Sequence, residues 1–197
     1  MSGKITQIIA IVGLVMLLAW LLLFWEPDGS GAGSSLTTAP AGGDFSLQSA
    51  DGPVNLREMR GKVVVLYFGY TFCPDVCPTS LSLLSATLHE LTAEELRQVQ
   101  VIFVSVDPER DTLDHLKTYA GYFHDNLIGA TGSREQIDDA ASKYGVGYNI
   151  IKNESEADYS VDHTSYTYII DKNGRLRFSL NHGTDPEEVS RTIRSLL

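Results

Sequence analysis

Residues 62–80 read KVVVLYFGYTFCPDVCPTS, and they contain both cysteines of the chain, Cys73 and Cys77. The first part of this segment is a continuous apolar run, typical of a strand that is buried on both faces of a sheet. A helical pattern follows at residues 79–91, with leucines spaced along one face. The two thiols therefore lie where a buried strand turns into a helix, a position at which ligand and redox sites are common.

The spacing of the two cysteines allows two kinds of site. Three residues separate Cys73 from Cys77, so on a helical turn both side chains would share one face. Two such sulfurs could bind one soft metal ion, or they could close a disulfide, since their Cα atoms would lie roughly 6 Å apart. The two states exclude each other, because disulfide sulfurs are no longer thiolate ligands. A purely structural disulfide is the plainest alternative, although a bridge across so short a loop stabilises a fold little.

The N-terminal 25 residues differ sharply from the rest of the chain. Residues 8–25 are all apolar or glycine, and residues 5–25 are long enough to cross a hydrocarbon core of about 30 Å. We expect residues 1–25 to form an uncleaved, single-pass membrane anchor, with a cleaved signal peptide as the alternative. Lys4 before the run and Glu26 after it favour a cytoplasmic N-terminus. In a bacterial inner membrane the remainder would then lie in the periplasm, the topological equivalent of the mitochondrial intermembrane space.

The rest of the chain predicts a linker and one α/β domain. Residues 26–43 are rich in small and turn-forming residues and predict a flexible linker, so the folded domain should occupy residues 44–197. We expect a hairpin at 45–56, strands at 62–69, 99–106 and 127–130, helices at 79–91, 111–123 and 133–143, a hairpin at 166–180 and a final helix at 185–197. This order predicts a central mixed sheet that is flanked by helices.

The sequence also predicts the structural positions of four residues near the ends of these elements. Pro78 suits the first position of its helix, because the N–H that proline lacks would be unpaired there. Asp111 is expected to be the N-cap of the helix at 111–123. Asp107 should end its strand at the same edge of the sheet as the cysteines. His163 is expected in the loop before the strand at 166–170, where fold and spacing alone leave it either a ligand or an ordinary loop histidine.

The composition limits the partners. The formal net charge is −10, which argues against nucleic acid, because phosphate binding needs a basic surface. An acidic chain remains compatible with a basic protein partner or with metal cations. In an exported domain Cys73 and Cys77 would meet oxidising conditions, so a thiol function would need an external thiol reductant.

Three motifs resemble the Sco/SenC family of copper proteins. They are TFCPDVCPT at residues 71–79, VSVDPERDT at 104–112 and VDHT at 161–164. The resemblance covers residues 44–197 and implies a thioredoxin-like fold. It implies that Cys73, Cys77 and His163 bind copper, as Cu(I), Cu(II) or both, and that Asp107 acts beside the site, either behind the ligands or in docking. It further implies delivery of copper to the binuclear site in subunit II of cytochrome c oxidase, or to another copper acceptor.

The donor types agree with that implication but leave other functions open. Two thiolates and an imidazole suit Cu(I) and can also hold Cu(II), while zinc is possible on ligand chemistry alone. A thiol-disulfide oxidoreductase that keeps the oxidase cysteines reduced would need only Cys73 and Cys77, as its catalytic residues. A redox or copper sensor would share the same site. A peroxidase is a weaker interpretation, because neither cysteine has the proline and threonine that precede the reactive cysteine of peroxiredoxins.

Overall fold

The computed structural model describes residues 7, 12–14, 16–18, 20, 40–152 and 159–197. The chain divides into two compact units, Met1–Thr37 and Thr38–Leu197, and the described residues of the first unit are helical and exposed. Within the described ranges, no helix has the length and apolar character that a bilayer crossing requires. The expected anchor at residues 1–25 and linker at 26–43 fall largely outside these ranges, so both stay predictions.

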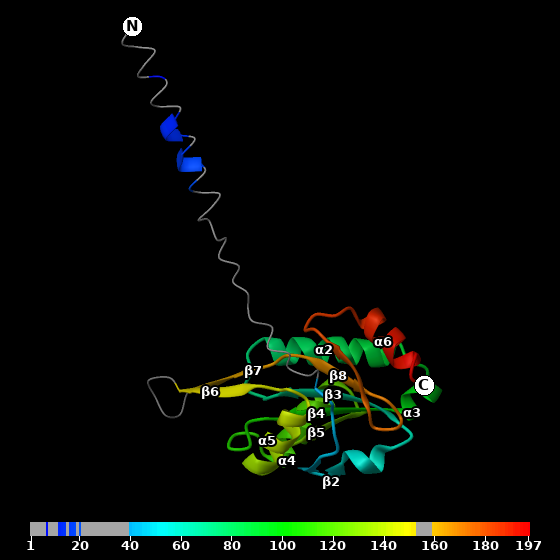
Figure 1. Ribbon diagram of the computed structural model, residues 1–197. Coiled ribbons are helices and arrows are strands. Elements are labelled where there is room, and N and C mark those ends of the chain that lie inside the picture. Colours follow the sequence, from blue (N-terminus) through cyan, green and yellow to red (C-terminus); the bar gives the residue numbers. More distant parts are fainter. Residues whose placement is uncertain (1–6, 8–11, 15, 19, 21–39, 153–158) are drawn as a thin grey trace. The chain divides into compact units, whose positions relative to one another are not determined.

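A five-stranded mixed sheet forms the centre of the second unit (Figure 1). The strands follow the order β5-β4-β3-β8-β9, with β3, β4 and β5 parallel and the last two antiparallel. Their bounds are β3 Val63–Gly69, β4 Val99–Ser105, β5 Leu127–Ala130, β8 Thr167–Ile170 and β9 Leu176–Leu180. All residues of β3 and β4 are buried, which explains why their sequences are apolar runs rather than alternating patterns. The predicted mixed sheet is confirmed.

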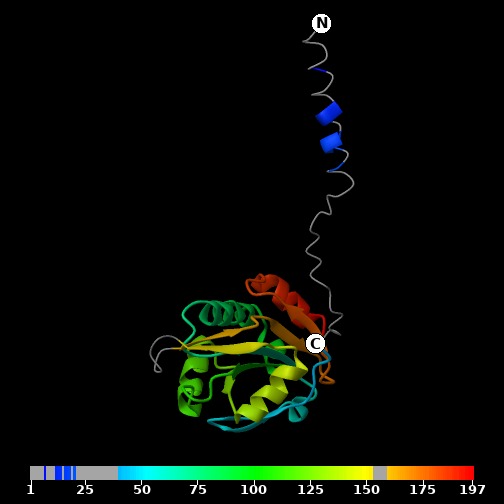
Figure 2. The same ribbon diagram turned by 60° about the vertical axis from the view of Figure 1, so that its left-hand side comes forward.

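Helices cover both faces of this sheet, as Figures 1 and 2 show. Helix α2 lies beside α6 on one face, and α4 and α5 lie on the other. The helices are α2 Val76–His89, α3 Ala93–Arg97, α4 Leu113–Phe123, α5 Arg134–Lys143 and α6 Pro186–Arg194. The hydrophobic core fills the space between sheet and helices, where residues such as Leu81 and Phe103 are fully buried. Helix α2, which carries Cys77, is therefore packed against the sheet. Cys73 lies in the loop that joins β3 to α2.

Two small antiparallel sheets flank the main one. The first pairs β1 (Ser46–Ser49) with β2 (Gly52–Asn55), followed by the 3-10 turn η1 (Leu56–Met59). The second pairs β6 (Tyr148–Lys152) with β7 (Tyr159–His163). His163 is thus the last residue of a strand and lies opposite Tyr148, whereas the sequence placed it in a loop. The expectation was wrong because the short run at 159–163 carries too few apolar residues to signal a strand by itself.

Two expected helix starts also differ from the structure. Helix α2 begins at Val76 with Asp75 as its N-cap, so Pro78 is the third helical residue rather than the first. Proline is tolerated there because the first-turn N–H groups have no intrahelical acceptor. Helix α4 has Thr112 as its N-cap, with the Thr112 side chain accepting a hydrogen bond from the His115 N–H. Asp111 is therefore not the cap, and its carboxylate is available for other contacts.

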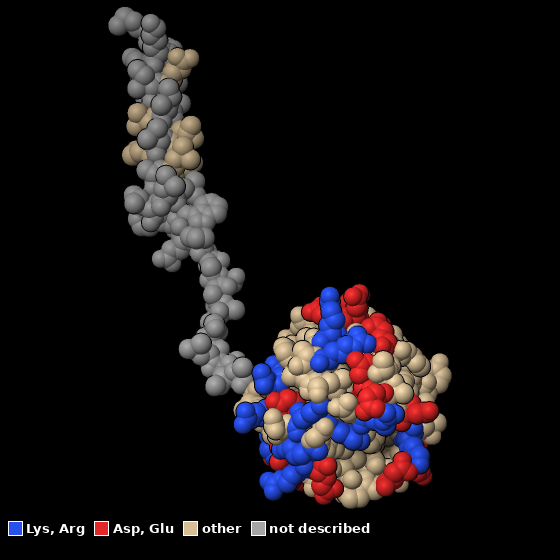
Figure 3. Space-filling model, turned by 90° about the vertical axis from the view of Figure 1, so that its right-hand side faces the viewer, with Lys and Arg blue, Asp and Glu red and all other residues tan. Residues whose placement is uncertain are grey.

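Charges of both signs are mixed on the surface of the folded domain. On the face shown in Figure 3, Lys and Arg side chains are interspersed with Asp and Glu. Some of the charged side chains of the domain form partly exposed ion pairs, such as Arg60 with Asp44 and Arg194 with Glu95. Because neighbouring charges of opposite sign cancel at a distance, this face produces no strong field of one sign for steering a charged partner.

Candidate metal centre

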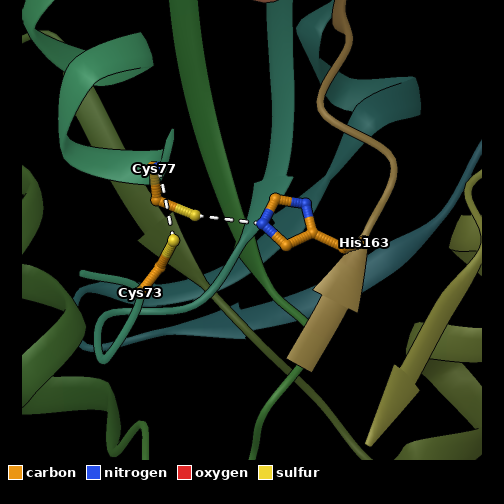
Figure 4. Close-up of side chains that lie close together, drawn as sticks. All are labelled: Cys73, Cys77 and His163. Carbon is orange, nitrogen blue, oxygen red and sulfur yellow. Dashed lines mark hydrogen bonds between the residues drawn. The ribbon is translucent and has the colours of Figure 1, made fainter. Parts of the chain in front are cut away.

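Three possible donor atoms lie close together at the connection between β3 and α2. The Sγ atoms of Cys73 and Cys77 and a ring nitrogen of His163 all lie within 4.8 Å of one another. Figure 4 shows the three side chains pointing toward a common point, with Cys77 Sγ 3.2 Å from His163 Nε2. Ligands held at about 2.0–2.3 Å from one ion are at most roughly 4.6 Å apart. Small side-chain shifts would therefore close these three donors around a single metal ion.

The protonation of His163 suits a metal ligand. Its Nδ1 lies 3.2 Å from the backbone oxygen of Thr164, and a carbonyl oxygen can only accept a hydrogen bond, so Nδ1 carries the proton. The lone pair on Nε2 is then free and faces the sulfurs, as in histidine ligands whose other nitrogen donates to a carbonyl. The rings of Tyr67 and Tyr70 pack edge-on against His163 at centroid distances of 6.2 and 6.0 Å. Both contacts restrict rotation of the imidazole.

The two cysteines differ in burial and in acidity. Cys77 is fully buried, whereas Cys73 is half-buried at the surface. Hydrogen bonding from the Cys77 side chain, together with that from the Cys77 backbone N–H at 3.4 Å, lowers the pKa of Cys73 to about 3 despite partial burial. The neighbouring Cys73 sulfur and burial raise the pKa of Cys77. Because the pKa of Cys77 is raised, a metal that binds both sulfurs must displace the proton of this thiol.

Iodoacetamide should label Cys73 selectively between pH 5 and pH 7. The thiolate is the reactive form, and the folded pKa of Cys73 lies below this window while an unfolded thiol has a pKa of about 8.5. The rate at Cys73 should therefore be nearly constant across the window and at least about tenfold above that of an unfolded thiol at pH 6. Cys77, protonated and buried, should react far more slowly. Timed labelling with peptide mass spectrometry measures both rates, and equal labelling of the two cysteines would contradict the asymmetry.

Asp111 supports the cysteine loop, a role that the sequence analysis missed. Its side chain is buried and accepts hydrogen bonds from the Thr71 N–H at 3.0 Å, the Thr71 hydroxyl and the Ser105 hydroxyl. Thr71 begins the loop that carries Cys73, and Ser105 ends β4. Asp111 therefore ties the start of the loop to the neighbouring strand. The next residue, Thr112, is also of an N-cap type, so the sequence allowed either residue to be the cap; Thr112 takes that place and leaves Asp111 without a capping role.

Asp107 lies behind the strand that carries His163. Its fully buried carboxylate accepts hydrogen bonds from the Tyr159 hydroxyl at 2.6 Å and from Arg110 Nε at 2.5 Å. Arg110 in turn donates to the backbone oxygen of Tyr159 and lies over its ring at 3.6 Å. Tyr159 begins β7 and His163 ends it, so this cluster anchors the strand of the histidine. A carboxylate without exposed surface favours this indirect support over contact with a docking partner.

A family profile, a related sequence and two solved structures resemble this chain over most of its length. A sequence profile of the family described as SCO1/SenC matches residues 33–197. An SCO2-like protein of Rickettsia conorii is 35% identical over 156 residues, covering 78% of this chain and 76% of that protein. The structure of Bradyrhizobium japonicum ScoI with copper bound is 36% identical, with a TM-score of 0.73, covering 79% of this chain and 99% of that one. BsSco, described as a member of the Sco family of cytochrome c oxidase assembly proteins with a disulfide switch, is 27% identical, with a TM-score of 0.63 and coverage of 81% and 94%.

Proposed function

The chain belongs to the SCO1/SenC family, and from this premise we propose that it is a copper metallochaperone for cytochrome c oxidase assembly. The convergence of Cys73, Cys77 and His163 carries the proposal. Two sulfurs and a neutral imidazole suit Cu(I) and can hold Cu(II). In the described part of the chain no fourth His, Cys, Asp or Glu joins the cluster, in contrast to the closed four-ligand sites of structural zinc. The open position is where a ligand of the acceptor can attack the bound copper and remove it.

Copper titration of the full-length chain, reduced and purified in mild detergent, tests the ligand set. The wild type should bind one equivalent and show intense thiolate-to-Cu(II) absorption. Cys73→Ser, Cys77→Ser and His163→Ala should each lower the copper affinity by at least about 100-fold, beyond the range of outer-shell changes. His182→Ala is the matched control, because the His182 ring is hydrogen-bonded to Ser80 rather than to a sulfur and should not alter binding. An unchanged spectrum in His163→Ala would rule out this ligand set.

The proposed recipient is the binuclear copper site in subunit II of the oxidase, or another periplasmic copper acceptor. We infer that residues 1–25 anchor the chain in a bacterial inner membrane, that residues 26–43 form a tether and that residues 44–197 carry copper in the periplasm. The uninterrupted apolar run at residues 8–25 and the small-residue composition that follows it support this arrangement. Transfer of copper from the loaded chain to purified subunit II, followed by optical absorption, tests the recipient directly.

A second function, thiol-disulfide exchange, is favoured by the asymmetry of the two cysteines. The half-buried Cys73 thiolate can attack a disulfide of a partner, forming a mixed disulfide and releasing one partner thiolate. Cys77 then loses its proton and attacks Cys73, which releases the second partner thiolate and closes the Cys73–Cys77 disulfide. An external thiol reductant must then restore both thiols. Full reductase activity in His163→Ala together with lost copper binding would assign this reaction to the dithiol alone.

A further inference from the structure

The three proposed ligands belong to two segments that are far apart in the chain. Cys73 lies in the cysteine loop, residues 70–75 between β3 and α2, and Cys77 lies in the first turn of α2, whereas His163 ends β7. A metal that binds all three requires the two segments to be held at a fixed separation. A disulfide between the cysteines requires only the first segment. A contact that joins the two segments should therefore affect copper binding and thiol exchange differently.

Arg110 contacts both segments through aromatic rings. Its guanidinium carbon lies 3.6 Å from the centre of the Tyr159 ring, at the start of β7, and 4.8 Å from the centre of the Phe72 ring in the cysteine loop. The ring of Tyr70, also in this loop, lies 5.7 Å from the same carbon and packs edge-on against His163. A planar guanidinium is suited to stacking on ring faces. Arg110 is thus a shared neighbour of the cysteine loop and of the histidine strand.

The hydrogen bonds of Arg110 hold it on the side of the histidine strand. Nε donates to the buried carboxylate of Asp107 at 2.5 Å, and Nη1 donates to the backbone oxygen of Tyr159 at 2.9 Å. The other terminal nitrogen, Nη2, is buried and has no acceptor among the described residues. A buried donor without an acceptor costs free energy, and nearby ring faces offset part of that cost for a cation. Toward the cysteine loop, Arg110 is therefore stabilised by ring faces rather than by hydrogen bonds.

We propose that Arg110 is a positioning residue that holds the cysteine loop and β7 at the separation which copper binding requires. The inference rests on the proposed copper function. The ion pair with Asp107 and the hydrogen bond to Tyr159 fix the guanidinium to the histidine strand, and Phe72 of the cysteine loop packs on the fixed group. Thiol exchange does not depend on this link, because both thiols belong to the same segment.

Phe72→Leu in the full-length, reduced chain tests the link, since it removes one ring face and leaves every hydrogen bond of Arg110 in place. The copper affinity, measured by competition with a chromophoric chelator, should fall by about tenfold. The rate of reaction with dithiodipyridine should stay within a factor of about two. In that reaction Cys73 attacks the reagent and Cys77 then closes the disulfide, so each chain releases two thiopyridone molecules, which are measured by absorption.

Phe178→Leu is the matched control. Phe72 is 54% exposed and Phe178, on the edge strand β9, is 38% exposed, so the two substitutions remove similar ring surface. No Arg or Lys side chain of the described residues lies over the Phe178 ring, in contrast to that of Phe72. Phe178→Leu should therefore match the wild type in both copper affinity and exchange rate.

Arg110→Lys tests the other side of the same contact. Lysine keeps a positive charge beside Asp107 but has no planar group to stack on Phe72. Its copper affinity should also fall by at least about tenfold. Phe72→Leu combined with Arg110→Lys should bind copper no more weakly than Arg110→Lys alone, because both changes break one contact and their effects are then not additive. Losses that multiply in the double variant would mean that the two side chains act independently, and would overturn the proposal.

The remaining outcomes separate this inference from the function on which it rests. If the wild type binds one equivalent of copper and Phe72→Leu binds it equally tightly, Arg110 has no such role. Equal losses in Phe72→Leu and Phe178→Leu, or a parallel fall of copper affinity and exchange rate, would also overturn it, because a general loosening of the fold explains both. If the wild type binds no copper, the copper function itself fails and this inference fails with it. Circular dichroism of each variant without copper checks that the fold is retained.

Discussion

Asp107→Ala should destabilise the folded domain by about 3–5 kcal/mol, the usual cost of breaking a buried ion pair from one side. The Asp107 side chain has no exposed surface, and that of its partner Arg110 is only 18% exposed. Without the carboxylate, the Arg110 guanidinium stays largely buried beside the Tyr159 ring with no counter-charge, and the Tyr159 hydroxyl loses its acceptor. Urea unfolding of the full-length variant and of the wild type, monitored by far-ultraviolet circular dichroism, measures the difference in the free energy of unfolding.

An exposed ion pair of the same domain supplies the control. Asp51 and Lys117 are 72% and 58% exposed, so Asp51→Ala should change the stability by no more than about 1 kcal/mol. In Asp107→Ala the copper affinity should fall as well, because the start of β7 is released and His163 lies at its other end. Equal stability losses in the two variants would contradict the anchoring role. A large loss of stability with unchanged copper affinity would restrict Asp107 to folding alone.

The sequence predicted the sheet and its helices because their signals are local. The apolar runs at 62–69 and 99–106 became β3 and β4, and the leucine pattern at 79–91 corresponds to most of α2. The β7 strand could not be predicted in the same way. It is paired with β6, and its first residue is held by Asp107 and Arg110 from a distant part of the chain. A strand that is stabilised by such contacts has only a weak strand pattern in its own sequence.

The same distinction applies to the metal centre. Cys73 and Cys77 could be recognised from spacing and from their place after an apolar run, whereas pattern alone left His163 undecided. His163 could be assigned as a ligand only from the family motif or from the fold, which places its ring 3.2 Å from Cys77 Sγ although the two residues are 86 positions apart in the chain.

Gly69→Ala should lower the copper affinity by at least about tenfold and the stability by about 1–3 kcal/mol. The backbone of Gly69 does not have a positive φ, so the conformation itself would accept alanine. The available space is the obstacle, because the new Cβ would lie 2.6 Å from Cys77 Sγ and 2.9 Å from the ring of Phe103. Both side chains are fully buried and cannot swing into solvent. The sulfur must therefore move away from its place opposite His163.

Gly121→Ala is the matched control, since it makes the same chemical change where nothing lies within 4 Å of the new Cβ. Gly121 is inside helix α4, so alanine there should stabilise the domain by about 0.5–1 kcal/mol and leave copper binding unchanged. The two substitutions should thus shift the urea midpoint in opposite directions. Wild-type copper binding in Gly69→Ala would mean that Cys77 can bind metal from a displaced position, and the close packing of sulfur, Tyr67 and His163 would then not be what sets the affinity. Loss of binding in this variant alone would place the origin of the affinity in that packing.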